Sequence, residues 1–157
     1  MQKLYFLMLA CLFVSSTFCQ ESNTNSKTFK PYASVGTTLS GGLYSFGGEF
    51  GMYQEKAWYA VGYSTVKGLG SDAERFHYAS VKSYFKLGSQ SIVDTYAYGG
   101  VNLGLTYDQP LYFEPGFAAV FNISNKFAPQ LMITAPMDQQ FKNPVLALGL
   151  SLNYWIK

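Results

Sequence analysis

The sequence is poor in cysteine, in charge and in long hydrophobic runs. Its two cysteines, Cys11 and Cys19, lie near the N-terminus, so no disulfide framework is expected in the rest of the chain. Charged residues make up 13% of the 157 residues, whereas a soluble globular domain carries about 25%. After residue 14 no apolar run approaches the roughly 20 residues of a membrane-spanning helix. These absences argue against a disulfide-rich domain, an ordinary soluble domain and a helical membrane protein.

The N-terminal segment has the pattern of a secretory signal peptide. A positively charged start precedes the apolar segment 4–14, and small polar residues follow it. We expect cleavage after Cys19, so that the mature chain begins at Gln20. The alternative is a lipoprotein that keeps a lipidated Cys19, but Phe18 stands where a small residue is expected. The prediction is a signal peptide over residues 1–19.

Aromatic residues and glycine are abundant, and they follow a two-residue period. The chain is 18% aromatic, with 13 Tyr, 13 Phe and 15 Gly. Segment 145–157 reads VLALGLSLNYWIK, in which large apolar residues alternate with Ala, Gly, Ser and Asn. Strict alternation is typical of a β-strand with two different faces. Few charges, many aromatics and alternating strands together favour a transmembrane β-barrel.

Eight such segments follow a polar, flexible tether over residues 20–28. The seventh is the weakest, because Pro129 and Pro136 each remove a ladder hydrogen-bond donor. We expect one all-β domain over residues 29–157, an eight-stranded antiparallel up-and-down transmembrane barrel with both termini on one side. The predicted strands are 29–39, 43–54, 57–67, 76–87, 92–107, 111–123, 127–137 and 145–157.

The two faces of the strands indicate which side meets lipid. A barrel of eight strands has an interior just wide enough for side chains, so the small residues are expected inside and the leucines outside. The alternative is a soluble barrel of the lipocalin type, with an apolar interior and a charged exterior. The polar face here is mostly Gly, Ser, Ala, Thr and Tyr, whereas a soluble surface carries roughly 25–35% charged residues. The membrane barrel is therefore favoured.

Taken together, the eight segments over 29–157 resemble the small outer-membrane β-barrels of Gram-negative bacteria, the group that includes the OmpA transmembrane domain and OmpX. Gly149, Leu152 and Tyr154 are similar to the C-terminal assembly signal that these barrels present to the insertion machinery. Trp155 to Lys157 follow the aromatic residue, which departs from the usual form. The resemblance implies an integral outer-membrane location with periplasmic termini, and outer-membrane lipid and the insertion machinery as partners.

An enzymatic role is not expected. Lipid A deacylase barrels use His and Ser two residues apart on an outward strand face, together with an acid. The only histidine, His77, has Ala79 at that spacing, and Ser80 falls on the opposite face, so base and nucleophile cannot share a proton. One histidine and no cysteine beyond Cys19 also argue against zinc. We predict no catalytic residue, metal or cofactor.

Charged residues on the inward face are the candidate site. Glu49, Lys82 and Glu114 are expected to point into the lumen, where an isolated charge is costly. We predict a Glu49–Lys82 ion pair with Glu114 as a second acceptor, and a second pair, Lys86 with Asp94, near the terminal rim. A gated ion path is the alternative, and a side-chain-filled lumen is favoured.

The function expected is that of a structural or accessory subunit of the outer membrane or of a larger outer-membrane complex. The alternative is a surface-binding or adhesion barrel that acts through its loops, and a lipid-modifying enzyme is less favoured. Short predicted turns such as 41–42 and 108–110 weaken the adhesion hypothesis. The net charge of +2 gives no indication of nucleic-acid binding.

Overall fold

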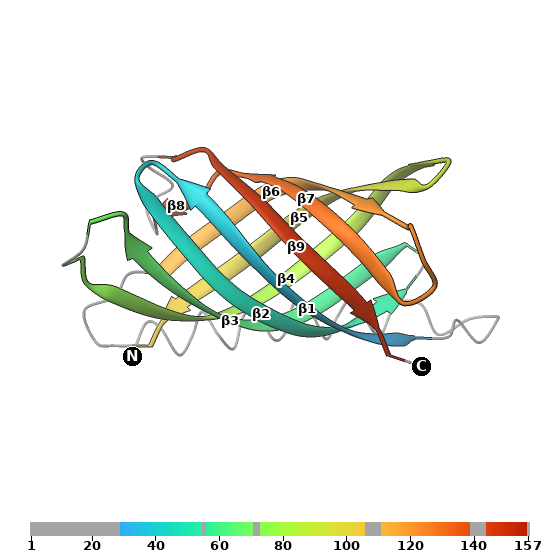
Figure 1. Ribbon diagram of the computed structural model, residues 1–157, viewed down its shortest axis with the longest axis horizontal. Coiled ribbons are helices and arrows are strands. Elements are labelled where there is room, and N and C mark those ends of the chain that lie inside the picture. Colours follow the sequence, from blue (N-terminus) through green and yellow to red (C-terminus); the bar gives the residue numbers. More distant parts are fainter. Residues whose placement is uncertain (1–28, 55, 71–72, 106–110, 139–143, 157) are drawn as a thin grey trace.

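The computed structural model describes residues 29–54, 56–70, 73–105, 111–138 and 144–156, which form a closed antiparallel β-barrel (Figure 1). The predicted signal peptide and the tether at 20–28 lie outside the described residues, as do the predicted turn at 108–110 and most of the loop 138–144. The strands are β1 (Lys30–Ser40), β2 (Leu43–Gln54), β3 (Ala57–Gly68), β4 (Arg75–Gln90), β5 (Val93–Gly104), β6 (Leu111–Phe121), β7 (Phe127–Thr134), β8 (Met137–Asp138) and β9 (Ala147–Trp155).

Pairing of the first strand with the last closes the wall. Each strand from β1 to β6 pairs antiparallel with the next one along the chain, and β9 lies between β7 and β1 (Figure 1). Gly36 is in register with Ser151, and a Cβ on Gly36 would lie 2.6 Å from the Ser151 Cβ. The inward face therefore needs glycine where the seam is tight. The predicted all-β, eight-stranded antiparallel barrel is confirmed.

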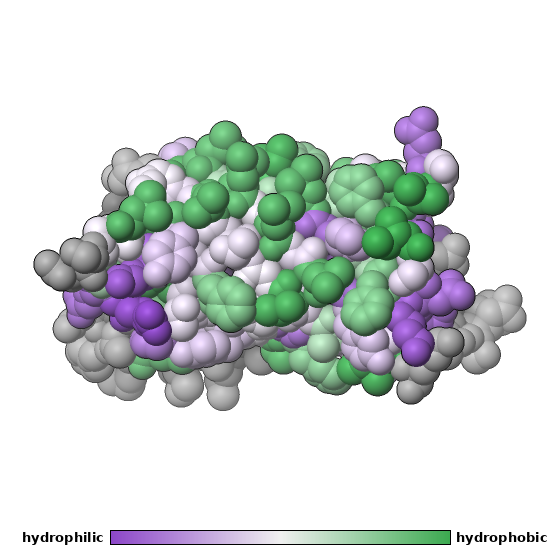
Figure 2. Space-filling model, in the orientation of Figure 1, coloured by the Kyte–Doolittle hydropathy of each residue, from purple (hydrophilic) through white to green (hydrophobic). Residues whose placement is uncertain are grey.

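The predicted alternation of the faces is also present. Leu148, Leu150 and Leu152 on β9 are 41–61% exposed. Gly149 and Asn153, on the opposite face of the strand, are buried. On the face shown in Figure 2, hydrophobic residues cover the middle of the barrel and hydrophilic residues gather toward its two ends. In water this exterior would be an extensive exposed apolar surface. It matches the exterior of a barrel that is embedded in lipid.

Two details of the strands differ from the prediction. The predicted seventh strand, 127–137, is broken: β7 ends at Thr134, and β8 pairs separately with β6. Pro136 lies at the break and has no N–H to continue the ladder. The predicted fourth strand, 76–87, is too short, because β4 continues to Gln90 across an irregularity in register between Lys86 and Gly88. Ser91, with φ of 54°, begins the turn instead.

The lumen has two different halves. Near the end where β1 begins and β9 ends, five aromatic side chains pack around Trp58, which is 1% exposed. Ring centroids lie 4.8 Å from Trp58 for Tyr96 and 5.3 Å for Tyr32. We call this cluster the aromatic plug; its members are Tyr32, Tyr53, Trp58, Tyr84, Tyr96 and Trp155.

The other half of the lumen is open, which corrects the expectation of a side-chain-filled lumen. It holds a cavity of about 560 Å³, which we call the vestibule. The inward residues there are small, among them Gly36, Thr38, Ser45, Gly47 and Ser64. Eight strands leave an interior that large side chains can fill, and these side chains are too small to do so. The barrel is therefore closed at one end and hollow at the other.

Candidate functional site: a charged layer below a luminal cavity

A layer of three charged residues lies between the plug and the vestibule. Lys82 on β4 has its Nζ 3.8 Å from Glu49 Oε2 on β2 and 3.8 Å from Glu114 Oε2 on β6. The side chains are only 16%, 12% and 13% exposed, in the order Lys82, Glu49 and Glu114. The structure thus brings together the predicted Glu49–Lys82 pair and the predicted second acceptor, Glu114, with the lysine shared between both carboxylates.

Glycines on the intervening strands make room for these contacts. Gly62 on β3 is in register with Glu49 and with Ser80, and a Cβ there would lie 3.2 Å from the Glu49 Cβ and 2.7 Å from Ser80 Oγ. Gly100 on β5 is in register between Lys82 and Glu114, and a Cβ there would lie 3.1 Å from Lys82 Cγ. Because neither glycine has a side chain, Lys82 can contact Glu49 across β3 and Glu114 across β5.

Neutral donors complete the hydrogen bonding of the two carboxylates. The Tyr32 hydroxyl donates to Glu49 Oε1 at 2.9 Å, and the Tyr84 hydroxyl donates to the same oxygen at 3.3 Å. The Tyr98 hydroxyl donates to Glu114 Oε1 at 3.2 Å, and Asn102 Nδ2 donates to Glu114 Oε2 at 2.8 Å. Each carboxylate therefore accepts hydrogen bonds from two neutral side chains in addition to its contact with Lys82.

A second ion pair lies near the β4–β5 turn. Lys86 Nζ is 2.8 Å from Asp94 Oδ1. Asn122 Nδ2 donates to Asp94 Oδ2 at 2.9 Å, and Ser89 Oγ donates to Asp94 Oδ1. The pair is separate from the vestibule, whose lining includes none of these residues. Its partners all come from strand ends near one rim, as expected for a local ion pair that stabilises the turn.

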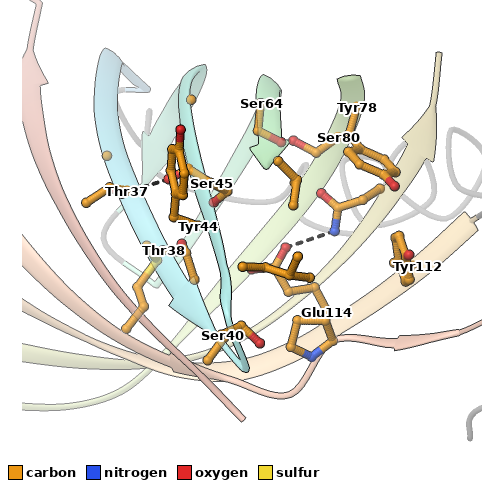
Figure 3. A pocket seen from close by; sticks show the side chains of 18 of the residues that line it. Thr37, Thr38, Ser40, Tyr44, Ser45, Ser64, Tyr78, Ser80, Tyr112 and Glu114 are labelled. Carbon is orange, nitrogen blue, oxygen red and sulfur yellow. Dashed lines mark hydrogen bonds between the residues drawn. The ribbon is translucent and has the colours of Figure 1, made fainter. Parts of the chain in front are cut away.

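The vestibule was not predicted from the sequence. Figure 3 shows Ser40, Ser45, Ser64, Ser80, Tyr112 and Glu114 around it. Its lining also includes apolar side chains from three strands, Val66, Phe76 and Met132. The available signal was the run of small inward residues at one end of the first three strands. The alternation of faces, however, gives no cavity volume, because that volume depends on how far each side chain reaches across the barrel.

The residues of the predicted assembly signal lie along β9. Gly149 faces inward, and a Cβ there would lie 2.9 Å from Met132 Cε. Leu152 and Tyr154 face outward at 41% and 40% exposure, and the Tyr154 ring lies 5.2 Å from that of Phe127. Packing within the wall and exposure on its outer face account for the type of residue at each of these three positions. Recognition by the insertion machinery stays a prediction.

His77 is far from a catalytic arrangement with Ser80. His77 Nδ1 contacts the Tyr63 hydroxyl at 2.5 Å on an exposed part of the wall, whereas Ser80 is 8% exposed and lines the vestibule. In the part of the chain that the structure describes, no group of three or more His, Cys, Asp or Glu could hold a metal ion. Those same residues contain no helix of the length and hydropathy needed to cross a membrane.

Solved structures with the same fold are transmembrane barrels. The N-terminal β-barrel domain of OprF from Pseudomonas aeruginosa matches with a TM-score of 0.66 and 10% identity, covering 83% of this chain and 100% of that one. A barrel described as de novo design of transmembrane β-barrels matches at 0.63 and 10%, covering 85% and 100%. The Yersinia pestis outer membrane protein Ail matches at 0.51 and 13%, covering 80% and 99%. No family model matches the chain, and no curated protein matches it.

These matches show a fold. The chain has the architecture of the small eight-stranded outer-membrane β-barrels, as the resemblance in the sequence implied. A designed barrel matches nearly as well as a natural domain. The shared fold therefore reflects the physical requirements of closing eight strands in lipid, and function has to be argued from this chain's own residues.

Proposed function

We propose that the protein is a small integral outer-membrane β-barrel that does not conduct and that serves as a structural or accessory subunit, either of the outer membrane or of a larger outer-membrane complex. The observation that carries the proposal is the combination of an apolar outer wall with a lumen closed by the aromatic plug. The wall requires a membrane, and the plug removes the through-path that a pore needs.

The distribution of charge supports the membrane location. Among the described strand residues, the charged side chains that face outward are Lys67 and Arg75, which are in register at the ends of β3 and β4. All charges nearer the middle of the wall, such as Lys82, face the lumen. A charge on the lipid face at the midplane costs about 2–4 kcal/mol, so this arrangement suits a bilayer. A lipocalin-type barrel would place its charges outside.

The plug supports a non-conducting role. Trp58 contacts the rings of Tyr32, Tyr84 and Tyr96 across the lumen at centroid distances of 4.8–5.5 Å. Trp155 closes the same end, 5.3 Å from Trp58. Closely packed rings leave no continuous water path, and the charged layer above them is held by its own hydrogen bonds. We therefore favour a closed barrel over a gated ion path.

The proposal includes the chain's route to the membrane. Residues 1–19 act as a signal peptide, residues 20–28 as a flexible periplasmic tether, and both ends of the barrel chain face the periplasm, so that the vestibule opens to the outside. Gly149, Leu152 and Tyr154 present the assembly signal to the barrel insertion machinery. The two-residue Gly41–Gly42 turn, with φ of 48° and 87°, projects little beyond the wall, which favours an accessory role over loop-mediated adhesion.

Two measurements test the proposal. Purified barrel is reconstituted in planar lipid bilayers, where no stable single-channel conductance is expected; regular conductance steps would refute the closed lumen. In parallel, the tagged protein is isolated from outer membranes solubilised in mild detergent. A stoichiometric outer-membrane partner is expected for an accessory subunit, and recovery of the barrel alone at native expression would contradict that role.

A further inference from the structure

We propose that the vestibule is a binding site for a small organic cation, a primary ammonium or guanidinium group carried on an apolar body. The inference goes beyond the structural role proposed above, because binding at this site needs neither a partner protein nor a conducting pore. It is based on the size of the cavity, the charge at its inner end and the nature of its walls.

The cavity has the dimensions of a small-molecule site. Its volume of about 560 Å³ falls within the 300–1,000 Å³ typical of such sites. It lies inside a closed wall, so a bound molecule would be surrounded by strands from all sides except the open end. Ligand sites of this kind are mostly apolar, with a few polar groups that fix orientation.

The charge at the inner end selects a cation. The charged residues that line the described cavity are Glu49, Lys82 and Glu114, two carboxylates and one ammonium group. The donors that contact the carboxylates, Tyr32 and Asn102 among them, are neutral. The layer therefore carries an excess negative charge that no lining side chain balances. Low exposure places this charge in a medium of reduced dielectric, where an added cation interacts strongly.

The walls between this layer and the open end suit an apolar body. Val66 and Phe76 are in register on β3 and β4 and both line the cavity. The rings of Tyr78 and Tyr112 lie 5.5 Å apart on the same lining. Aromatic faces attract cations and also pack against apolar groups. An anion would meet two carboxylates here, and a fully polar ligand would leave these walls without matching contacts.

A single matched series of probes tests the charge preference. Phenethylamine, 2-phenylethanol and 3-phenylpropionate share one phenyl group and differ in charge. The barrel is reconstituted in lipid nanodiscs and labelled with ¹³C-methyl methionine. Met132 lines the vestibule, and Met52 lies on the outer wall at 37% exposure. The Met132 methyl signal therefore reports binding in the cavity, whereas the Met52 signal reports partitioning of the probe into lipid.

We expect phenethylamine to shift the Met132 signal saturably, with affinity at least about tenfold higher than that of 2-phenylethanol, and 3-phenylpropionate to bind more weakly still. Glu114→Gln should weaken phenethylamine about tenfold or more, since it removes the excess charge. Asp94→Asn is the matched control, because it removes a luminal carboxylate outside the vestibule. It should leave the affinity unchanged.

Three results would overturn the proposal: equal affinity for the amine and the alcohol, a shift of Met52 without Met132, or unchanged affinity in Glu114→Gln. Folding of each variant is checked by the difference in gel migration between boiled and unboiled samples. Should Glu114→Gln fail to fold, Ser64→Phe fills the cavity from β3 and should abolish saturable binding. Wild-type affinity in Ser64→Phe would equally reject the site.

Discussion

Glu49 and Lys82 contact each other across a strand that contributes only a hydrogen atom at the point of crossing. Lys82 Nζ lies 3.8 Å from Glu49 Oε2. The strand between them is β3, where Gly62 is in register with Glu49. Because Lys82 lies equally close to Glu114, the three residues form one unit with a central cation. The stability lost when one of the three residues is replaced should therefore depend on which charged contacts the other two still make.

Removal of the lysine should therefore be worse than removal of one carboxylate. Lys82→Met leaves two buried carboxylates without a cation and should lower the free energy of unfolding by about 3–5 kcal/mol. Glu49→Gln leaves Lys82 paired with Glu114 and should cost less than half as much. Urea unfolding in lipid vesicles measures both, with the double mutant completing the cycle. Equal costs for the two single mutants, or additive effects, would show that the residues act independently.

Glycine at position 51 should be required by the packing of the plug. A Cβ there would lie 2.2 Å from the Tyr59 carbonyl oxygen and 2.7 Å from Tyr32 Cε1. Gly51→Ala should therefore cost about 1–3 kcal/mol of unfolding free energy. Gly99→Ala is the control, because nothing lies within 4 Å of the added Cβ. If Gly99→Ala lost as much stability, the effect would come from replacing any strand glycine and not from the packing around position 51.

A charge introduced on the outer face of β9 should destabilise the barrel, whereas a small change on its inner face should not. Leu150 is 61% exposed, and its replacement by arginine should destabilise the barrel by about 2–4 kcal/mol. Ser151→Ala, one residue away on the inward face, should leave stability within about 0.5 kcal/mol. Refolding yield and urea unfolding in vesicles report both variants. Wild-type folding of Leu150→Arg would refute the lipid-facing assignment of β9.

Trp58 should be the most sensitive position of the aromatic plug. The side chain is 1% exposed and contacts rings from several strands, so Trp58→Ala should cost about 3–5 kcal/mol. Trp58→Phe keeps an aromatic ring at the centre and should cost less. The temperature at which the fast-migrating folded band disappears on gels ranks the variants. A tolerated Trp58→Ala would mean that the plug contributes little to stability.

The location of the protein is tested by fractionation. We expect the mature chain to begin at Gln20, to resist carbonate extraction and to migrate differently on gels when boiled, because a closed barrel survives detergent until it is heated. N-terminal sequencing of the protein from purified outer membranes measures the cleavage site. Recovery in the soluble periplasmic fraction would restore the lipocalin-type alternative.

Local patterns in the sequence were sufficient to predict the faces of the strands and the positions of most of them, although not the break after Thr134. Alternation has a period of two in any β-strand, so the segment 145–157 by itself showed which residues of the last strand share a face. Leu150 outward and Gly149 inward followed directly. The number of strands, together with the cost of an unpaired edge in lipid, then determined that the sheet closes.

Tertiary structure decided how the predicted charged residues reach one another across the barrel and how much of the lumen is filled. Lys82 contacts both Glu49 and Glu114 because the residues at 62 and 100 lack side chains, and the importance of those two glycines appears only once neighbouring strands are in register. The division of the lumen also emerged only in three dimensions. Trp58 and its tyrosines meet at one end of the barrel, while Gly36, Ser45 and Ser64 meet at the other. Whether a lumen is filled or hollow depends on which side chains from separate strands share a level, and that is set by register and closure together.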